Sequence, residues 1–147
     1  MDERAFRQVR EAVLDSPCPF EKALFAGCGQ CVLAQRRNLA EREVIACRSA
    51  AARADCTALL QRLRLNARFA LHLHPARDRL THAQEMKVQC GGLSGLRRAL
   101  AGTDEPGDLH ELVCSAHRRE GGLESLPYAA LMQAVAAWQP RRRARRP

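Results

Sequence analysis

The sequence has few aromatic residues and few lysines. Phe, Trp and Tyr make up 4% of its 147 residues, and Lys22 and Lys87 are its two lysines. Residues with β-branched side chains are also sparse beside Ala, Leu, Arg and Glu, which have high intrinsic helix propensity. The composition therefore predicts an all-α fold.

A long apolar run is also missing at the start of the chain. Residues 1–15, MDERAFRQVREAVLD, mix charged residues with an apolar stripe, which is typical neither of a secretory signal nor of a membrane-spanning helix. We therefore expect no transmembrane segment and a cytoplasmic location. Disulfides are rare in a reducing cytosol, and the odd number of seven cysteines also argues against a closed disulfide framework. Metal binding, thiol redox chemistry and simple packing remain as roles for the cysteines.

Turn and capping signals divide the chain into about six to seven helices, which we expect to pack as a compact bundle. Asn38 with Glu41, Thr81 with Gln84, and Asp108 with Glu111 resemble capping boxes, and Ser49 is a further N-cap. Cys90-Gly91-Gly92 is a glycine-type helix end. Helices are predicted at about 3–14, 20–37, 38–48, 81–90 and 126–138, with a longer one after Ser49 and shorter ones at 93–100 and after Asp108.

The chain is predicted to form a single helical domain over residues 1–139, with a Cys-rich N-terminal half, followed by an Arg-rich tail at 140–147. The net charge is +8, but five arginines lie in that tail, so 19 basic and 16 acidic residues leave +3 for residues 1–140. A short run of like charges without apolar residues is typical of a disordered, solvated end.

Five of the seven cysteines lie within residues 18–56. Cys28 and Cys31 are three residues apart, so their side chains point to the same side and can share a metal centre. Cys47 and Cys56 fall on the apolar stripes of the helices predicted on either side of Ser49. A break at Ser49 is needed for these two thiols to meet, because nine residues of continuous helix would put them on opposite faces.

Four thiolates suffice for zinc or for an iron–sulfur cluster. Zinc sites usually use two short Cys or His pairs, whereas this chain has one such pair and dispersed further cysteines, which favours a cluster of the 4Fe-4S type. Nearby glycines allow backbone N–H groups to approach the sulfurs, and nearby arginines offset the cluster's negative charge. These residues are Gly27, Gly29, Gly91, Gly92, Arg36, Arg37 and Arg48.

The preferred ligand set is Cys28, Cys31, Cys47 and Cys56, with Cys18 and Cys90 in reserve. A set with Cys18 in place of Cys56 fits the spacing nearly as well. The alternatives are a structural zinc site and a metal-free core, because single buried cysteines commonly act as small apolar residues.

Other chemistry has weaker support in the sequence. His110, Cys114 and His117 share one helix face but lack the Glu base of a metalloprotease helix. The Cys28-x2-Cys31 pair lacks the βαβ context of a thioredoxin-type site. No phosphate-binding loop or nucleophile elbow is found, so a catalytic function is not expected.

The expected function is therefore that of a metal-binding, most simply iron–sulfur, helical protein in electron transfer, redox or gas sensing, or cluster handling. A protein redox or assembly partner is implied. Two alternatives stay open: a non-catalytic protein–protein interaction module with a metal-free Cys-rich core, and a zinc- or cluster-containing regulator that binds nucleic acid, with the Arg-rich tail as the possible contact.

Overall fold

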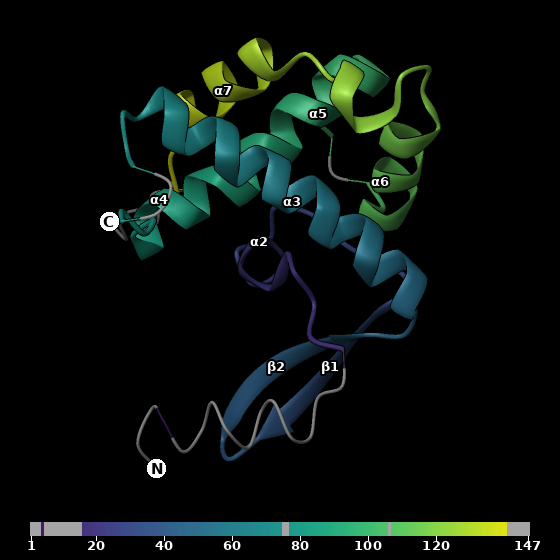
Figure 1. The fold of residues 1–147 in the computed structure, drawn as a ribbon. Helices are drawn as coiled ribbons and strands as arrows, with labels where there is room; N and C mark the ends of the chain where they lie inside the picture. The colour runs from purple at the N-terminus through teal and green to yellow at the C-terminus, as the bar shows by residue number, and fades with distance from the viewer. Residues whose placement is uncertain (1–3, 5–15, 75–76, 106, 141–147) are drawn as a thin grey trace, which may run out of the picture.

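The computed structural model describes residues 4, 16–74, 77–105 and 107–140. The helix predicted at 3–14 lies outside these residues except for Arg4. The predicted tail lies outside them except for Pro140. The described chain is mostly helical and carries a two-stranded sheet that extends from one end of the helical body (Figure 1). The prediction of an all-α fold is thus right for most of the chain and wrong for residues 34–47.

The elements follow one another as a short helix, a hairpin and then helices only. Their bounds are α2 Glu21–Phe25, β1 Ala34–Leu39, β2 Arg42–Cys47, α3 Ala50–Ala70, α4 His82–Met86, the π-helical η1 Lys87–Gly91, α5 Gly92–Ala101, α6 Leu109–Arg118, the 3-10 helix η2 Gly122–Ser125 and α7 Tyr128–Ala137. None of the helices in the described part of the chain is long and apolar enough to cross a membrane.

A β-hairpin replaces the helix predicted at 38–48 and the end of the one predicted at 20–37. β1 and β2 pair antiparallel from Ala34 opposite Cys47 to Leu39 opposite Arg42. Ala40 and Glu41 form the two-residue turn with φ angles of 51° and 67°. The capping signal at Asn38 misled the prediction because this turn carries neither Asn nor Gly, the residues that usually mark positive φ.

Helix α3 begins where the Ser49 signal predicts. The Ser49 side chain accepts a hydrogen bond from the Ala52 N–H at 3.1 Å, so it caps the helix. One face of α3, including Cys56, is buried in the apolar core. The largest fully buried side chains of that core come from all parts of the described chain: Phe20, Ile45, Leu59, Leu63, Leu93, Leu96 and Leu131.

The helix that starts at the Thr81–Gln84 capping box does not stop at Gly91 and Gly92. It runs through α4, η1 and α5 and ends at Gly102, which has a φ of 70°. A Cβ on Gly91 would lie 2.6 Å from Cα of Val135 in α7. These glycines therefore allow close helix packing rather than ending a helix.

This continuous helix also explains the helix count. With α4, η1 and α5 counted as one, the residues that the structure describes form five α-helical segments, fewer than the predicted six to seven. The predicted cap of α6 is confirmed, because Asp108 accepts a hydrogen bond from the Glu111 N–H at 3.2 Å. The last helix is shorter than predicted and starts after Pro127.

Candidate functional site

Cys18 lies beside the end of β2. The Cys18 N–H donates to the Ile45 carbonyl at 3.0 Å, and the Cys47 N–H donates to the Ser16 carbonyl at 2.7 Å. These two bonds run the 16–18 segment antiparallel to β2. Cys18 thus lies opposite Ile45, and Ser16 lies opposite Cys47, so Cys18 and Cys47, 29 positions apart in the printed sequence, are diagonal neighbours across this pairing.

Cys31 reaches the same end of the hairpin from the other strand. The Ala34 N–H donates to the Cys31 carbonyl at 3.1 Å in a tight turn, and Ala34 is paired with Cys47. The Arg48 N–H also donates to the Leu33 carbonyl at 2.9 Å. The turn that carries Cys31 is thereby fixed to the residues around Cys47.

Cys56 completes the group from the start of α3. Ser49 links the end of β2 to this helix, and Cys56 faces the core against which Cys18 and Cys31 pack. Each of Cys18, Cys31, Cys47 and Cys56 lies close enough to the other three for their charges to affect one another. We call these residues the four-thiol group; all four thiols are free.

Burial raises the pKa values of three thiols in this group. The pKa values of Cys18 and of Cys56 are raised to about 12, chiefly by burial and to a smaller extent by the neighbouring thiols of the group. Burial is also the main cause of the raised pKa of Cys31, and the Asp108 carboxylate adds to it. At neutral pH these thiols therefore keep their protons, and a metal that binds them must displace those protons.

Backbone N–H groups partly offset the effect of burial at two of these sulfurs. The N–H group of Phe20 lowers the pKa of the Cys18 thiol, and those of Leu33 and His110 lower the pKa of the Cys31 thiol. His110 lies in the first turn of α6, whose start is fixed to the Cys31 loop by the Leu109 N–H, which donates to the Gln30 carbonyl at 2.6 Å. Such N–H donors favour thiolates and metal-bound sulfur.

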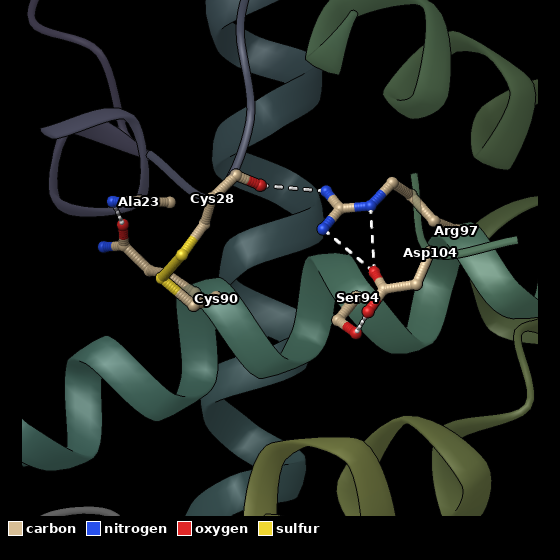
Figure 2. Close-up of a disulfide and its surroundings, with 7 residues drawn as sticks. Ala23, Cys28, Cys90, Ser94, Arg97 and Asp104 are labelled. Carbon is tan, nitrogen blue, oxygen red and sulfur yellow. Dashed lines mark hydrogen bonds and ion pairs between the residues drawn. A yellow bond between two sulfur atoms is a disulfide. The ribbon is translucent and has the colours of Figure 1, made fainter. Parts of the chain in front are cut away.

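The structure pairs the other two cysteines of the predicted set. Cys28 and Cys90 form a disulfide, with their Cα atoms 5.5 Å apart, between the loop after α2 and the η1 helix (Figure 2). A sulfur in a disulfide is not a thiolate, so it cannot serve as a thiolate ligand of a metal. In this state the candidates Cys28 and Cys90 are therefore separate from Cys31, Cys47 and Cys56.

Cys114 and the two histidines of α6 do not form a second site. The Cys114 sulfur lies 3.7 Å from Nε2 of His110, while Nε2 of His117 lies 3.1 Å from the Asp55 carbonyl oxygen. Among the described residues, no three Cys, His, Asp or Glu side chains are close enough together to hold a single metal ion.

A surface cavity of about 380 Å³ opens beside Cys31. Its lining includes Gly29, Gln30 and Arg36. Arg36 itself is ion-paired with Glu43 at 2.9 Å, so its charge is partly balanced within the hairpin. Cys31 is thus the member of the four-thiol group that lines a described surface cavity, whereas Cys56 is buried.

Sequence reasoning undervalued Cys18 because it assigned helices where the chain forms extended backbone. The relevant spacing is Cys18-x12-Cys31-x15-Cys47-x8-Cys56, which has no short pair. One local signal was available: Val44 and Ile45, adjacent β-branched residues just before Cys47, favour a strand.

Comparisons of the chain with protein-family models, with curated proteins and with solved structures give no match.

Proposed function

We propose that this protein binds an iron–sulfur cluster through the four-thiol group and serves electron transfer, redox sensing or cluster handling. The observation that carries the proposal is that backbone pairing at the end of the hairpin, and the helix that begins after Ser49, bring four free thiols from separate chain segments to one region. Ligation by four cysteine thiolates is the usual way in which proteins hold a 2Fe-2S or 4Fe-4S cluster. The backbone N–H groups that lower the pKa values of Cys18 and Cys31 are of the kind that stabilises cluster sulfurs.

The spread of the thiols favours a cluster over a single zinc ion. A zinc ion needs its ligands at one point, at about 2.3 Å from each sulfur. A cluster instead offers a separate iron to each thiolate, so its ligands stand further apart. In the described part of the chain, no three Cys, His, Asp or Glu side chains are placed to hold one metal ion, so a single zinc ion has no ready site there.

Cys31 is half-buried and lines a surface cavity, so a cluster bound to it would lie close to the protein surface. A protein that donates or accepts an electron, or that delivers or receives the cluster, would approach on this side. We propose the cytoplasm as its compartment, because a reducing environment keeps four unpaired thiols available for a metal; the Cys28–Cys90 disulfide would there be exposed to reductants.

The proposal is tested by purifying the wild-type protein anaerobically from iron-replete cells and measuring iron, acid-labile sulfide and zinc per chain. We expect brown protein with broad near-visible absorption and matching iron and sulfide. Colourless protein with stoichiometric zinc would replace the cluster by a zinc site. Colourless protein that lacks both metals, and whose folding is unaffected by chelators, would reject metal binding.

Two serine variants give the matched control. Serine is nearly isosteric with cysteine but is a poor ligand for soft metals. The Cys31→Ser variant should lose the metal, whereas Cys114→Ser should keep it, since Cys114 contacts His110 and lies outside the four-thiol group.

A further inference from the structure

The disulfide joins the loop that carries Cys31 to the core of the protein. Cys28 lies three residues before Cys31, in the loop that follows α2, whereas Cys90 is 1% exposed within η1. Figure 2 shows the bridge between these two elements, with Arg97 donating to the Cys28 carbonyl oxygen at 2.9 Å. Within the described residues, this disulfide is the covalent bond that ties the loop of Cys28 and Cys31 to η1.

The loop has a structure that permits movement when the bridge opens. Gly27 has a φ of 76°, and a Cβ at this position or at Gly29 would meet no atom closer than 3.9 Å. The loop's other tethers are hydrogen bonds, including the one from the Val32 N–H to Oδ1 of Asp108 at 2.9 Å. Such bonds open and re-form locally far more readily than a covalent bond does.

One cysteine of the bridge is partly exposed and the other is buried. Cys28 is half-buried at the edge of a cavity of about 480 Å³ that is also lined by Gly27, Met86 and Trp138. Cys90 contributes to the same cavity but lies almost wholly inside the core. An attacking thiol would therefore meet Cys28 first.

We propose that Cys28 and Cys90 form a reversible thiol switch that controls how firmly Cys31 is held. This inference rests on the proposed function for its consequence, the release of a cluster, but not for the switch itself. With the bridge closed, the loop holds Cys31 against the other three thiols. With the bridge open, Cys31 exchanges with solvent and with incoming ligands.

The opening step needs a dithiol reductant. One of its thiolates attacks the sulfur of Cys28 and forms a mixed disulfide, and the Cys28–Cys90 bond breaks as Cys90 takes up a proton. The second thiol of the reductant then displaces Cys28, which leaves as a thiol. The reductant ends as its own disulfide, so two electrons and two protons have passed to Cys28 and Cys90.

The first experiment needs no metal. Metal-free wild-type protein with the bridge closed, and the Cys28→Ser/Cys90→Ser double variant, are treated with iodoacetamide, and modification of each cysteine is followed by peptide mass spectrometry. We expect Cys31 to react about three- to tenfold faster in the double variant, because loss of a tether favours local opening. Cys114, on α6, should react at the same rate in both and serves as the internal control.

A second preparation guards against a folding defect in the variant. Wild-type protein reduced with a phosphine, its helical circular dichroism unchanged, should show the same acceleration at Cys31. The switch is rejected if Cys28 and Cys90 are both freely alkylated in protein that has never met a reductant. It is also rejected if opening the bridge leaves the Cys31 rate unchanged.

The last measurement connects the switch to the cluster. Transfer of iron from cluster-loaded protein to a chelator should be several-fold faster after the bridge is opened. If the protein holds no cluster but the Cys31 alkylation rate still responds, the proposed function fails and the switch stands. If the cluster is present and is lost at the same rate in both states, the control of the cluster by the bridge is rejected.

Discussion

Cys47 stands opposite Ala34 in the antiparallel pairing of β1 and β2. Because Ala34 also closes the turn that begins at Cys31, this register decides which thiols are neighbours. A slip by one residue would turn the side chain of Cys47 to the other face of the hairpin. The candidate site therefore depends on a short sheet as much as on the surrounding helices.

The first prediction separates the two possible ligand sets. The Cys18→Ser and Cys56→Ser variants should lose most of their bound iron, because a ligand is missing. Cys28→Ser should still carry iron when purified without a chelator, because Cys28 is paired with Cys90 and is not a ligand, although its open bridge should speed transfer of iron to a chelator. Iron and sulfide per chain, measured after anaerobic purification, provide the test. Loss of iron in Cys28→Ser together with full retention in Cys18→Ser would reverse the assignment.

The second prediction concerns the hairpin turn. Ala40 and Glu41 both have positive φ, which costs a residue with a Cβ roughly 1–2 kcal/mol. Replacing them by Asn and Gly, the pair favoured in such turns, should raise the free energy of unfolding by about 1 kcal/mol. Urea unfolding of the double variant measures this change. A decrease in stability would show that these backbone angles are not those of the folded hairpin.

A third prediction tests the close approach of α7 to η1. A Cβ on Gly91 would lie 2.6 Å from Cα of Val135 and 2.8 Å from the carbonyl oxygen of Ala134, both backbone atoms that cannot easily shift. Gly91→Ala should therefore destabilise the protein by about 1–3 kcal/mol.

Gly107→Ala is the matched control for this helix contact. A Cβ at Gly107 would meet nothing within 4 Å. Its substitution should change stability by about 0.5 kcal/mol or less. Equal effects of the two variants in thermal or urea unfolding would contradict the observed packing.

The fourth prediction concerns acid sensitivity at Glu85. Burial opposes ionisation of this side chain, but hydrogen bonds from Arg64 and Gln89 and the charge of Arg64 outweigh it, so its pKa lies below the usual 4.5. A lowered pKa means that the ionised form stabilises the fold above pH 4.5. This stabilisation is lost as the pH falls through the folded-state pKa.

Glu85→Gln should accordingly be less stable than the wild type by about 1–3 kcal/mol at pH 7, because the Arg64 guanidinium loses its charged partner. The difference should shrink as the pH is lowered below 4.5. Urea unfolding at a series of pH values measures both effects. A difference that stays constant down to acid pH would mean that Glu85 is not ionised in the folded protein.

Features that depend on local interactions could be predicted from the sequence. The capping residues Ser49, Thr81 and Asp108 act where their spacing predicts, since an N-cap needs only a side chain and the next three backbone N–H groups. The apolar stripe of α3, with Cys56 facing inward, likewise follows from helical periodicity.

Features that depend on distant partners could be seen only in the folded chain. Apart from Val44 and Ile45, residues 34–47 have no strong local preference for a strand, and they form one because β1 and β2 satisfy each other's backbone groups. Gly91 does not end a helix. It is instead the position where α7 packs so closely that a side chain would not fit.

The identity of neighbouring cysteines follows from the same long-range contacts. Pairing with β2 brings Cys18 to Cys47, and packing of the loop after α2 against η1 brings Cys28 to Cys90. The sequence supplied the thiols and placed Cys56 on an inward face. It could not supply their grouping, because the spacing of thiols along a chain does not fix their distances in space.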